Sequence, residues 1–494
     1  MAAQYRSVNG GAARLARAPA DDALPLVVDL EGALLKVNAL HESLIALLVR
    51  RPWQLVRALL ILIARGRAHM EAMIASLHIV DVETLPLREE FLMWLRRQAA
   101  EGRELHLVSA ADQGMVERLA ARLRLFDSCV GNDGHLNLKG AAKADYLTRR
   151  FPEGFSYAGG SAAELAVWRS ASAAIVAGAQ CAVRRCIESL NKPIEAEFLV
   201  PKVGTAVFLK QLRLHQWSKN LLVFLPLLLA HRFTDLQGWL HALLAFSGMS
   251  LVASGTYMVN DLTDLSDDRR HITKRNRPLA AGVFPGLAAV AIAPLMLIVG
   301  FVLAFAATPQ AALVLAVYLA ITLAYTFRLK RVPLLDTAVI GSLFTLRIVL
   351  GAVAVRAPPS PWLLAFSVML FFSLAMAKRH SEIAKASRST ALARIAGRGY
   401  EPGDVLLTLV YGIASGVASL VISMLYITNG VATVLYGSPD WLWAVPLLLY
   451  LWQMRVWLLA HRGMLDDDPI VFALKDKTSL ALGVGCLLAL YLAL

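Results

Sequence analysis

The stretch NDLTDLSDDRRHITKRNRPLAAG, residues 260–282, follows directly after the apolar run LVASGTYMV and combines acidic with basic side chains. In a helix, Asp261, Asp264 and Asp268 lie at positions i, i+3 and i+7, so their carboxylates share one face. Three anions on one face repel one another unless a cation holds them together. Mg²⁺ prefers such hard oxygen ligands and often shares its coordination shell between protein carboxylates and substrate phosphates.

Basic and amide side chains complete the stretch. Asn260 lies beside the first aspartate, and Lys274, Arg275 and Arg277 follow the acidic part. Arginine can bind two phosphate oxygens at once. The pattern therefore predicts a Mg²⁺-diphosphate site at the mouth of a hydrophobic segment, with these four side chains binding substrate. The simpler interpretation is a solvated helix end in which aspartates and arginines pair with one another.

The composition indicates where this site lies. Of the 494 residues 57% are hydrophobic, and the mean hydropathy of +0.57 lies well above that of soluble proteins. Residues 1–200 mix charged and apolar residues as a soluble domain does, whereas from about residue 221 long apolar runs alternate with short basic loops. The sequence predicts a soluble N-terminal domain followed by an all-α membrane domain.

Nine apolar stretches are candidates for crossing a bilayer, which takes about 17–25 residues. They centre on residues 221–231, 239–259, 283–306, 310–327, 335–355, 362–377, 404–428, 440–460 and 478–494. Arginine and lysine fall mainly in alternate loops, which the positive-inside rule makes cytoplasmic. We therefore expect a multi-pass protein of the inner (cytoplasmic) membrane, with the N-terminal domain in the cytoplasm and the C-terminus outside. This topology explains the net charge of +13, so no nucleic-acid partner is expected.

The aspartate stretch resembles the first motif of the UbiA superfamily of intramembrane prenyltransferases, which has the form NDxxDxxxD followed by KRxRP. The match here is NDLTDLSDD and then KRNRPLAAG, and the resemblance extends over about residues 205–494. It implies a UbiA-type bundle of transmembrane helices, a transferase activity and Mg²⁺ held by Asp261, Asp264 and Asp268.

Several further blocks resemble one branch of that superfamily, the decaprenyl-phosphate phosphoribosyltransferases, which make lipid-linked phosphoribose for arabinan precursors of the cell envelope. The blocks are LRLHQWSKNLLVFLP, YTFRLKRVPLLD, IGSLFTLRIVLGAVAV and AKRHSEI. The resemblance implies that they supply substrate-binding residues, namely Lys219, Asn220, Tyr325, Lys330, Arg347, Lys378, Arg379 and Glu382.

Simpler interpretations exist for some of these residues. Lys219 and Lys330 have the positions of membrane-interface anchors, and Glu382 has basic neighbours with which to pair. Arg347 lies inside an apolar span, where an ion is expensive and is usually functional.

The second aspartate motif of the prenyltransferases, often DxxxD, is incomplete here, because Asp336 is followed four positions later by Ile340. One acidic motif among many cations suits substrates that carry more phosphate than a prenyl diphosphate does. The pair that the resemblance implies, 5-phosphoribosyl 1-diphosphate and a polyprenyl phosphate, is such a combination. The alternative is a prenyltransferase that moves a polyprenyl group from its diphosphate to an aromatic or other acceptor. A third hypothesis is a transporter or scaffold that only binds polyprenyl lipids.

The N-terminal region contains PLVVDLEGALL at residues 25–35, a hydrophobic strand that runs into an acidic loop. It resembles the first motif, DxDGT, of the haloacid dehalogenase (HAD) superfamily of phosphatases, with Asp29 at the nucleophile position and Glu31 at that of the acid/base. The strand LHLVSAADQ places Ser109 as in the second motif, and NLKGAAKADYL supplies Lys139 for the third, with Lys143 as the alternative. The resemblance implies a Rossmann-like α/β domain with a helical cap at about residues 36–100.

The fourth motif of that superfamily, GDSxxD, appears as GGSAAE, with Gly160 in place of an aspartate and Glu164 at the end. The resemblance implies that Asp29 and Glu164 bind Mg²⁺ and that Asp29 attacks phosphorus. Gly160 removes an expected metal ligand, so two hypotheses stay open. Either the domain hydrolyses the 5-phosphate of the product made by the membrane domain, or it is inactive and binds a phosphosugar or a partner.

These inferences divide the chain into a disordered lead-in (residues 1–22), the α/β domain (23–185), a linker (186–205) and the transmembrane domain (206–494). The run ALLILIA at residues 58–64 is too short to span a bilayer and is flanked by arginines, so we assign it to a helix of the soluble domain. Oligomeric state and lipid chain length stay open.

Overall fold

The computed structural model describes residues 24–77, 79–133, 138–179, 181–200, 204–389, 399–465 and 469–494. The lead-in predicted at residues 1–22 lies outside this part of the chain. The described residues form two compact units. The first unit combines the chain up to Leu212 with Met258–Ile292, and the second combines Arg213–Tyr257 with the chain from Ala293 onward.

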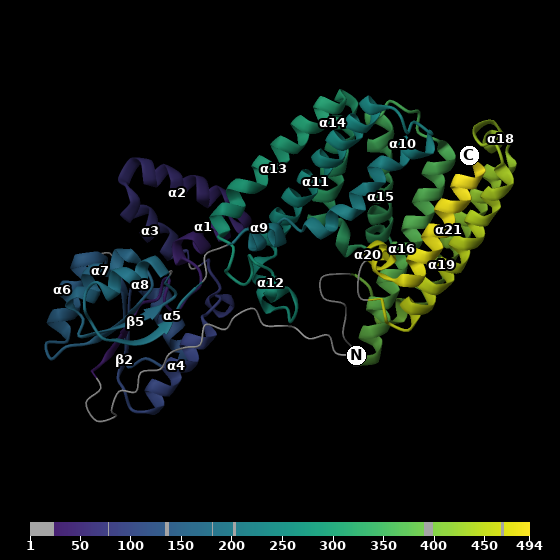
Figure 1. Cartoon of the computed structure of the whole chain (residues 1–494). Coiled ribbons are helices and arrows are strands. Elements are labelled where there is room, and N and C mark those ends of the chain that lie inside the picture. Colours follow the sequence, from purple (N-terminus) through teal and green to yellow (C-terminus); the bar gives the residue numbers. More distant parts are fainter. Residues whose placement is uncertain are drawn as a thin grey trace. The chain divides into compact units, whose positions relative to one another are not determined.

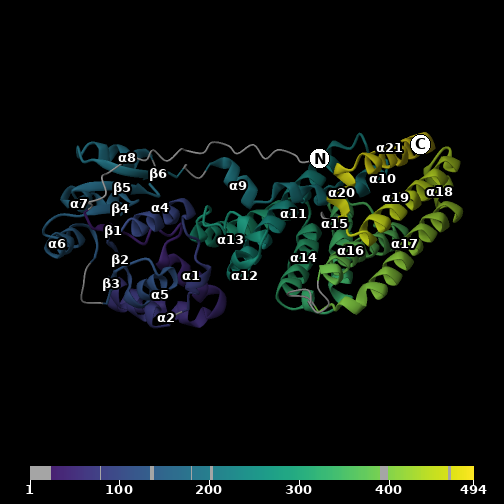
Figure 2. The ribbon, with the colours of Figure 1, turned by 90° about the horizontal axis from the view of Figure 1, so that it is seen from below.

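The first unit is built on a six-stranded parallel sheet with the strand order β3-β2-β1-β4-β5-β6 (Figure 2). The strands are β1 Leu26–Val28, β2 Leu105–Asp112, β3 Ser128–Asn132, β4 Ser156–Gly159, β5 Ala173–Ala177 and β6 Ile194–Phe198. Successive strand residues point to opposite faces. Leu26 and Val28 therefore enter one core, and Val27 enters the other.

Helices cover both faces of the sheet (Figure 1). One face packs against α4 Glu89–Ala100 and α5 Gln113–Leu123. The other packs against α6 Gly140–Arg150, α7 Leu165–Ser170 and α8 Cys181–Glu188. A parallel sheet covered on both faces is the α/β fold that the sequence predicts.

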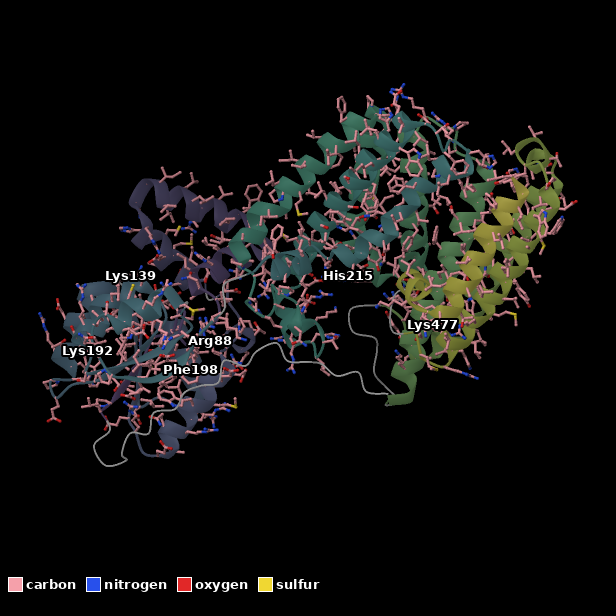
Figure 3. All side chains as sticks on the ribbon, viewed as in Figure 1. Arg88, Lys139, Lys192, Phe198, His215 and Lys477 are labelled. Carbon is pink, nitrogen blue, oxygen red and sulfur yellow. The ribbon has the colours of Figure 1, made fainter. Side chains whose placement is uncertain are left out.

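The helical insertion after β1 consists of α1 Ala39–Arg50, α2 Pro52–Arg65 and α3 Arg67–Ser76. These three helices share a small core of their own. The predicted cap reached residue 100, but α4 packs on the sheet, where its Phe91 and Trp94 rings contact Phe198 of β6. Figure 3 labels Phe198 in this domain. The part of the insertion that stands apart from the sheet is thus shorter than predicted.

The predicted linker at residues 186–205 contains the last strand of the sheet. β6 pairs in parallel with β5, with Ile175 opposite Ala196 and Val176 opposite Glu197. The α/β domain therefore extends beyond residue 185, and α9 Thr205–Gln211 follows it.

Seven helices are long and apolar enough to cross a membrane in the described part of the chain, which makes the protein a multi-pass membrane protein. They are α11 Leu236–Thr263, α13 Gly286–Ala307, α14 Pro309–Phe327, α15 Leu335–Ala354, α16 Pro361–Ser389, α17 Val405–Thr428 and α19 Ala444–His461. Each corresponds to a predicted span.

The predicted total of nine spans is not confirmed. The segment around residues 221–231 forms the 3-10 helix η3 Leu214–Phe224 and the short α10 Leu225–Leu229, which has Pro226 in its first turn. The last stretch forms α21 Lys477–Ala493, which is apolar but shorter than the other seven. The second unit also contains α18 Val431–Leu435, α20 Pro469–Lys475 and short 3-10 turns.

Candidate active site

The predicted face of aspartates forms at the end of a spanning helix. α11 ends at Thr263, and after Asp264 the chain continues as α12 Leu265–Arg270. The amide of Asp264 donates to the carbonyl of Asn260 at 2.9 Å, and that of Asp268 donates to the carbonyl of Asp264 at 2.8 Å. Helical hydrogen bonding therefore continues across the junction and keeps Asp261 and Asp268 on one side of the chain.

One guanidinium joins these two carboxylates. Arg277 Nη1 lies 3.1 Å from Asp261 Oδ1 and 2.5 Å from Asp268 Oδ2. Gln211 Nε2 donates to Asp261 Oδ2 at 3.2 Å, and Lys274 Nζ lies 3.7 Å from Asp268 Oδ1. The side chains of Asp261 and Asp268 are only 3% and 2% exposed, so this is a buried carboxylate pair with cations at its edge.

Burial raises the pKa of Asp268, because loss of water outweighs the opposing effect of Arg277. Additional positive charge at this position would favour the ionised carboxylate. Among the other predicted residues of the stretch, Asp264 and Asn260 are half-buried, and Lys274 and Arg275 are exposed. The structure thus concentrates the candidate site on Asp261, Asp268 and Arg277.

The donor set fits Mg²⁺. In the described part of the chain, no group of three or more His, Cys, Asp or Glu side chains could hold a metal ion. Asp261 and Asp268 supply two buried carboxylates, and Mg²⁺ is commonly held by one or two carboxylates together with water and substrate phosphate. The coordination shell of Mg²⁺ at such a site becomes complete only when a substrate phosphate binds.

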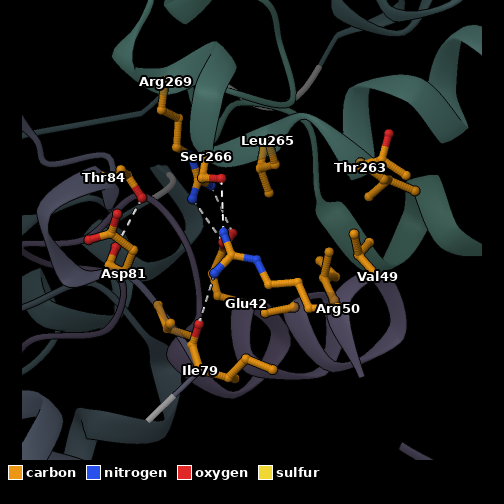
Figure 4. Close-up of a pocket in the computed structure, with 14 residues that line it drawn as sticks. Glu42, Val49, Arg50, Ile79, Asp81, Thr84, Thr263, Leu265, Ser266 and Arg269 are labelled. Carbon is orange, nitrogen blue, oxygen red and sulfur yellow. Dashed lines mark hydrogen bonds and ion pairs between the residues drawn. The ribbon is translucent and has the colours of Figure 1, made fainter. Parts of the chain in front are cut away.

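The aspartate stretch is anchored on the α/β domain. Arg269 of α12 donates from Nη1 and Nη2 to the two carboxylate oxygens of Glu42 in α1, each at 2.9 Å. Both side chains are less than a tenth exposed. Arg50 Nη2 donates to Ser266 Oγ at 3.0 Å (Figure 4). Arg270 pairs with Asp81.

The surroundings of that anchor are packed. A cavity of about 50 Å³ lies beside Glu42, Arg50 and Arg269, which is too small for a sugar diphosphate. At the other end of the stretch, Gly282 has φ +70° and packs against Lys36, Val37 and Pro86, so a side chain there would be both strained and crowded. Sequence reasoning missed Glu42, since no local pattern connects it with an arginine 227 positions away.

In the second unit, Arg347 belongs to an internal polar network. Its Nε donates to Asn220 Oδ1 at 2.8 Å, and its Nη2 donates to the Tyr318 hydroxyl at 3.3 Å. Asn220 in turn donates to Ser250 Oγ at 2.9 Å. Lys219 is buried, with its ammonium 5.8 Å from the centre of the Phe344 ring. These contacts join η3, α11, α14 and α15.

Asp336 belongs to a second cluster of buried polar side chains. Arg379 Nη2 is 2.8 Å from Asp336 Oδ2, and the Tyr400 hydroxyl donates to Asp336 Oδ1 at 2.6 Å. Arg379 also pairs with Glu382, as the sequence allowed, and Tyr325 lies within electrostatic range of all three charged groups. The remaining predicted residues of this unit, Lys330 and Lys378, are half-buried.

The α/β domain brings Asp29 and Lys143 together at the carboxyl end of β1. Lys143 Nζ lies 2.7 Å from Asp29 Oδ1 and 3.9 Å from Glu164 Oε1, and both residues of the first pair are buried. Lys139, the first choice for the third motif, is instead half exposed and lies 3.8 Å from Glu71. Lys139 precedes α6, whereas Lys143 sits in its first turn and points to the sheet.

Glu164 does not fit as a metal ligand. Its oxygens accept hydrogen bonds from the Tyr157 hydroxyl at 2.7 Å and from the amides of Gly160 and Ser161, each at 3.0 Å. Burial and the negative charge of Asp29 raise the pKa of Glu164 to about 8. Three hydrogen-bond donors of the protein thus already occupy the oxygens of Glu164.

Gly160 and Glu31 also depart from a metal-dependent phosphatase site. A Cβ at Gly160 would collide with the carbonyl oxygens of Ala177 and Gly32, so an aspartate could not stand there without a backbone shift. Glu31 accepts hydrogen bonds from the Ala39 amide at 2.8 Å and from Asn38 Nδ2 at 3.1 Å, which fix it to the start of α1. The residues around Asp29 therefore do not fit the predicted Mg²⁺.

Ser109 is buried within β2, and its Oγ accepts a hydrogen bond from the Ala111 amide at 3.2 Å. This contact lies where the pairing of β2 with β3 shifts register, between Val108 and Asp112. The structure thus gives Ser109 a local hydrogen bond within its strand.

The raised pKa of Glu164 predicts a pH effect on the α/β domain. Because its folded-state pKa of about 8 exceeds its ordinary value of 4.5, its stabilising contribution is complete below pH 4.5 and is lost as the pH rises toward 8. We expect Glu164→Gln to raise the melting temperature at pH 8 relative to the wild type, with little change at pH 5. Thermal unfolding at both pH values checks this, and a lower melting temperature of the variant at pH 8 would contradict it.

Apolar spanning helices and a buried carboxylate pair together define a polytopic membrane protein with an acidic site. The sequence profile of the UbiA prenyltransferase family matches residues 221–474, which is about half of the chain. The chain therefore belongs to the UbiA prenyltransferase family.

Three relatives extend this result. The chain is 45% identical to the uncharacterized protein y4nM of Sinorhizobium fredii over 94% of this chain and 90% of that protein. It is 33% identical to nodulation protein NoeC of Azorhizobium caulinodans over 59% of this chain and 94% of that protein. It is also 33% identical to decaprenyl-phosphate phosphoribosyltransferase of Mycolicibacterium smegmatis, over 56% and 89% respectively.

Proposed function

We propose that the protein transfers 5-phosphoribose from 5-phosphoribosyl 1-diphosphate to a polyprenyl phosphate, giving polyprenyl-phosphate phosphoribose and diphosphate. The observation that carries this proposal is that both carboxylate oxygens of Asp336 are already bound within the protein. Asp336 is the one acid at the position of the second aspartate motif, and Arg379 and Tyr400 already occupy its two oxygens. A second Mg²⁺ for a prenyl diphosphate would have to displace Arg379, whose side chain is 2% exposed, whereas Arg277 at Asp261 and Asp268 is 27% exposed and has room to turn toward a phosphate.

The similarity to decaprenyl-phosphate phosphoribosyltransferase supports the same choice of substrates. Membership of the UbiA prenyltransferase family supports the alternative, in which a polyprenyl group moves from its diphosphate to an acceptor. The two reactions differ in which substrate carries the diphosphate, so an assay can separate them.

Asp261 and Asp268 would hold Mg²⁺, with Asp264 as a further candidate. When bound, the ion neutralises the diphosphate and stabilises it as a leaving group. Arg277 keeps the two carboxylates together, and with Lys274 it places positive charge where diphosphate oxygens gather. Arg275, an exposed cation of the same stretch, would serve the 5-phosphate.

The acceptor needs no strong base. A phosphate monoester has a second pKa of about 6, so a polyprenyl phosphate is largely dianionic at neutral pH. Its oxygen forms the new bond to the anomeric carbon while the bond from that carbon to the diphosphate oxygen breaks. The protein contributes positioning and charge stabilisation, and a single displacement inverts the anomeric configuration.

We further propose that the α/β domain does not hydrolyse the 5-phosphate. Gly160 leaves no room for the aspartate of the fourth motif, and hydrogen bonds within the protein hold the carboxylates of Glu31 and Glu164. The domain instead serves as the support of the aspartate stretch through Glu42. The N-terminal domain and this stretch would face the cytoplasm of the inner membrane, with the C-terminus on the opposite side.

Purified full-length protein with Mg²⁺, radiolabelled 5-phosphoribosyl 1-diphosphate and decaprenyl phosphate tests the proposal. We expect an organic-phase lipid whose mass is that of decaprenyl-phosphate phosphoribose with its 5-phosphate intact. A lipid lacking that phosphate, absent in Asp29→Asn, would return phosphatase activity to the α/β domain. No labelled lipid, together with consumption of a prenyl diphosphate when an aromatic acceptor is supplied, would replace the transfer proposed here by prenyl transfer.

A further inference from the structure

Helix α2 carries an apolar face that points away from the protein. Its sequence is PWQLVRALLILIAR, and Trp53 is 84%, Leu60 61% and Ile63 83% exposed. With Val56, these residues are spaced i, i+3, i+7 and i+10, so they share one face of the helix. Exposed side chains of this size, clustered on one helix face, mark an interaction surface.

The opposite side of α2 explains why this face is left over. Ala58 is the one fully buried residue of α2, and it enters the small core that α2 shares with α1 and α3. Leu55 and Ile61 pack against that core as well. The side of α2 that contains Ala58 thus packs in the small core, and the exposed apolar face makes no contribution to that core.

The charge around this face has a single sign. Residues 50–70 contain five arginines and no acidic residue. Arg51 and Arg65 flank the helix, Arg57 lies at the border of the apolar face, and all three are exposed. A helix with tryptophan and aliphatic side chains on one face and arginines at its border is the pattern of helices that lie in a bilayer interface.

α2 also begins close to a point where the chain enters the membrane. α1 ends at Arg50, two residues before α2. Ile45 of α1 packs so tightly on Gly286, the first residue of the spanning helix α13, that a Cβ on this glycine would collide with it. The insertion therefore contacts the end of a transmembrane helix, and its next helix is within reach of the lipid head groups.

We propose that α2 is a membrane-surface helix, whose Trp53–Leu60–Ile63 face inserts into the interface of an anionic bilayer while its arginines bind lipid phosphates. A second copy of the chain would present the same positive charges to this face, so like-charge repulsion disfavours a pairing of two α2 helices. Anionic phospholipid matches both the apolar face and the charge. This attachment goes beyond the proposed transfer and does not depend on it.

Spin labelling of the full-length protein in nanodiscs tests this proposal. The background replaces Cys129, Cys181, Cys186 and Cys486 by serine, and the label is attached to Ile63→Cys. The matched control is Arg118→Cys on α5, an exposed position on the sheet domain. Because both substitutions alter exposed side chains, elution volume and melting temperature should equal those of the unlabelled background.

Power-saturation electron paramagnetic resonance then compares access of oxygen, which concentrates in lipid, with access of a water-soluble nickel chelate. We expect the label at position 63 to favour oxygen by at least about tenfold over the control position in nanodiscs that contain phosphatidylglycerol. Equal access of nickel at both positions would overturn the proposal. So would low access of both reagents with spin–spin broadening, which would place a second copy on the face.

A second comparison tests the part of the arginines. In nanodiscs of phosphatidylcholine alone, or after Arg57→Gln together with Arg65→Gln, the label at position 63 should become more accessible to nickel. Unchanged access in both cases would show that phosphate binding has no part in the attachment, which would contradict the proposed partner.

Discussion

Asp261→Asn is expected to abolish lipid-linked phosphoribose formation, with turnover lowered by about a hundredfold to a thousandfold, the loss typical for one group that stabilises developing charge. The carboxylate is buried beside Arg277 and Gln211, so an amide there keeps the shape and removes the charge that would hold Mg²⁺. Asp268→Asn should have a similar effect, since Arg277 joins the two side chains.

Initial rates of product formation at saturating substrate and rising Mg²⁺ measure this effect. The matched control is Asp267→Asn, because Asp267 lies next to Asp268 in α12 but is exposed. Its rate should stay within about twofold of the wild type, as expected for a surface substitution. Asp268→Glu should keep partial activity at a higher Mg²⁺ requirement. Full activity of Asp261→Asn would remove the carboxylate pair from the proposed mechanism.

The second large effect is expected at the anchor between the α/β domain and the aspartate stretch. Glu42→Ala leaves the guanidinium of Arg269 buried without its carboxylate partner, which costs about 3–5 kcal/mol in comparable buried pairs. Since α12 carries Asp268, the loss should also lower transfer. We expect a lower melting temperature in detergent and a reduced rate that additional Mg²⁺ does not restore.

Two further variants test whether the unpaired charge of Arg269 causes the loss of stability in Glu42→Ala. Glu83→Ala removes an acid that is 71% exposed and pairs with Arg122 at 3.3 Å, so it should change stability by less than about 1 kcal/mol. The double variant Glu42→Leu with Arg269→Met removes both charges and should be more stable than Glu42→Ala. If the double variant lost as much stability as Glu42→Leu and Arg269→Met lose together when measured singly, the two side chains would act independently.

The elements that sequence could predict are those with a local pattern. The seven spanning helices follow from apolar length alone, and LHLVSAADQ gives β2 through its hydrophobic run. The shared face of Asp261 and Asp268 follows from helical spacing, which continues through the junction at Asp264.

The elements that could not be predicted depend on contacts distant in sequence. Lys139 and Lys143 are one helical turn apart, and the choice between them depends on where α6 begins, at Gly140. The partner of Arg269 is supplied by an insertion more than two hundred residues earlier. Glu164 matches a metal ligand by its position in a motif, but the amides of Gly160 and Ser161 and the Tyr157 hydroxyl decide its chemistry.

The tight packing of Gly282 against residues 36–37 and 86 also bears on how the protein is made. The ribosome completes all six strands of the α/β domain before residues 260–282 leave the exit tunnel, and domains generally fold as units during synthesis. The finished domain is then a template on which the aspartate stretch settles as α11 and α13 enter the bilayer. The aspartate stretch would thus reach its final position only after the α/β domain has folded.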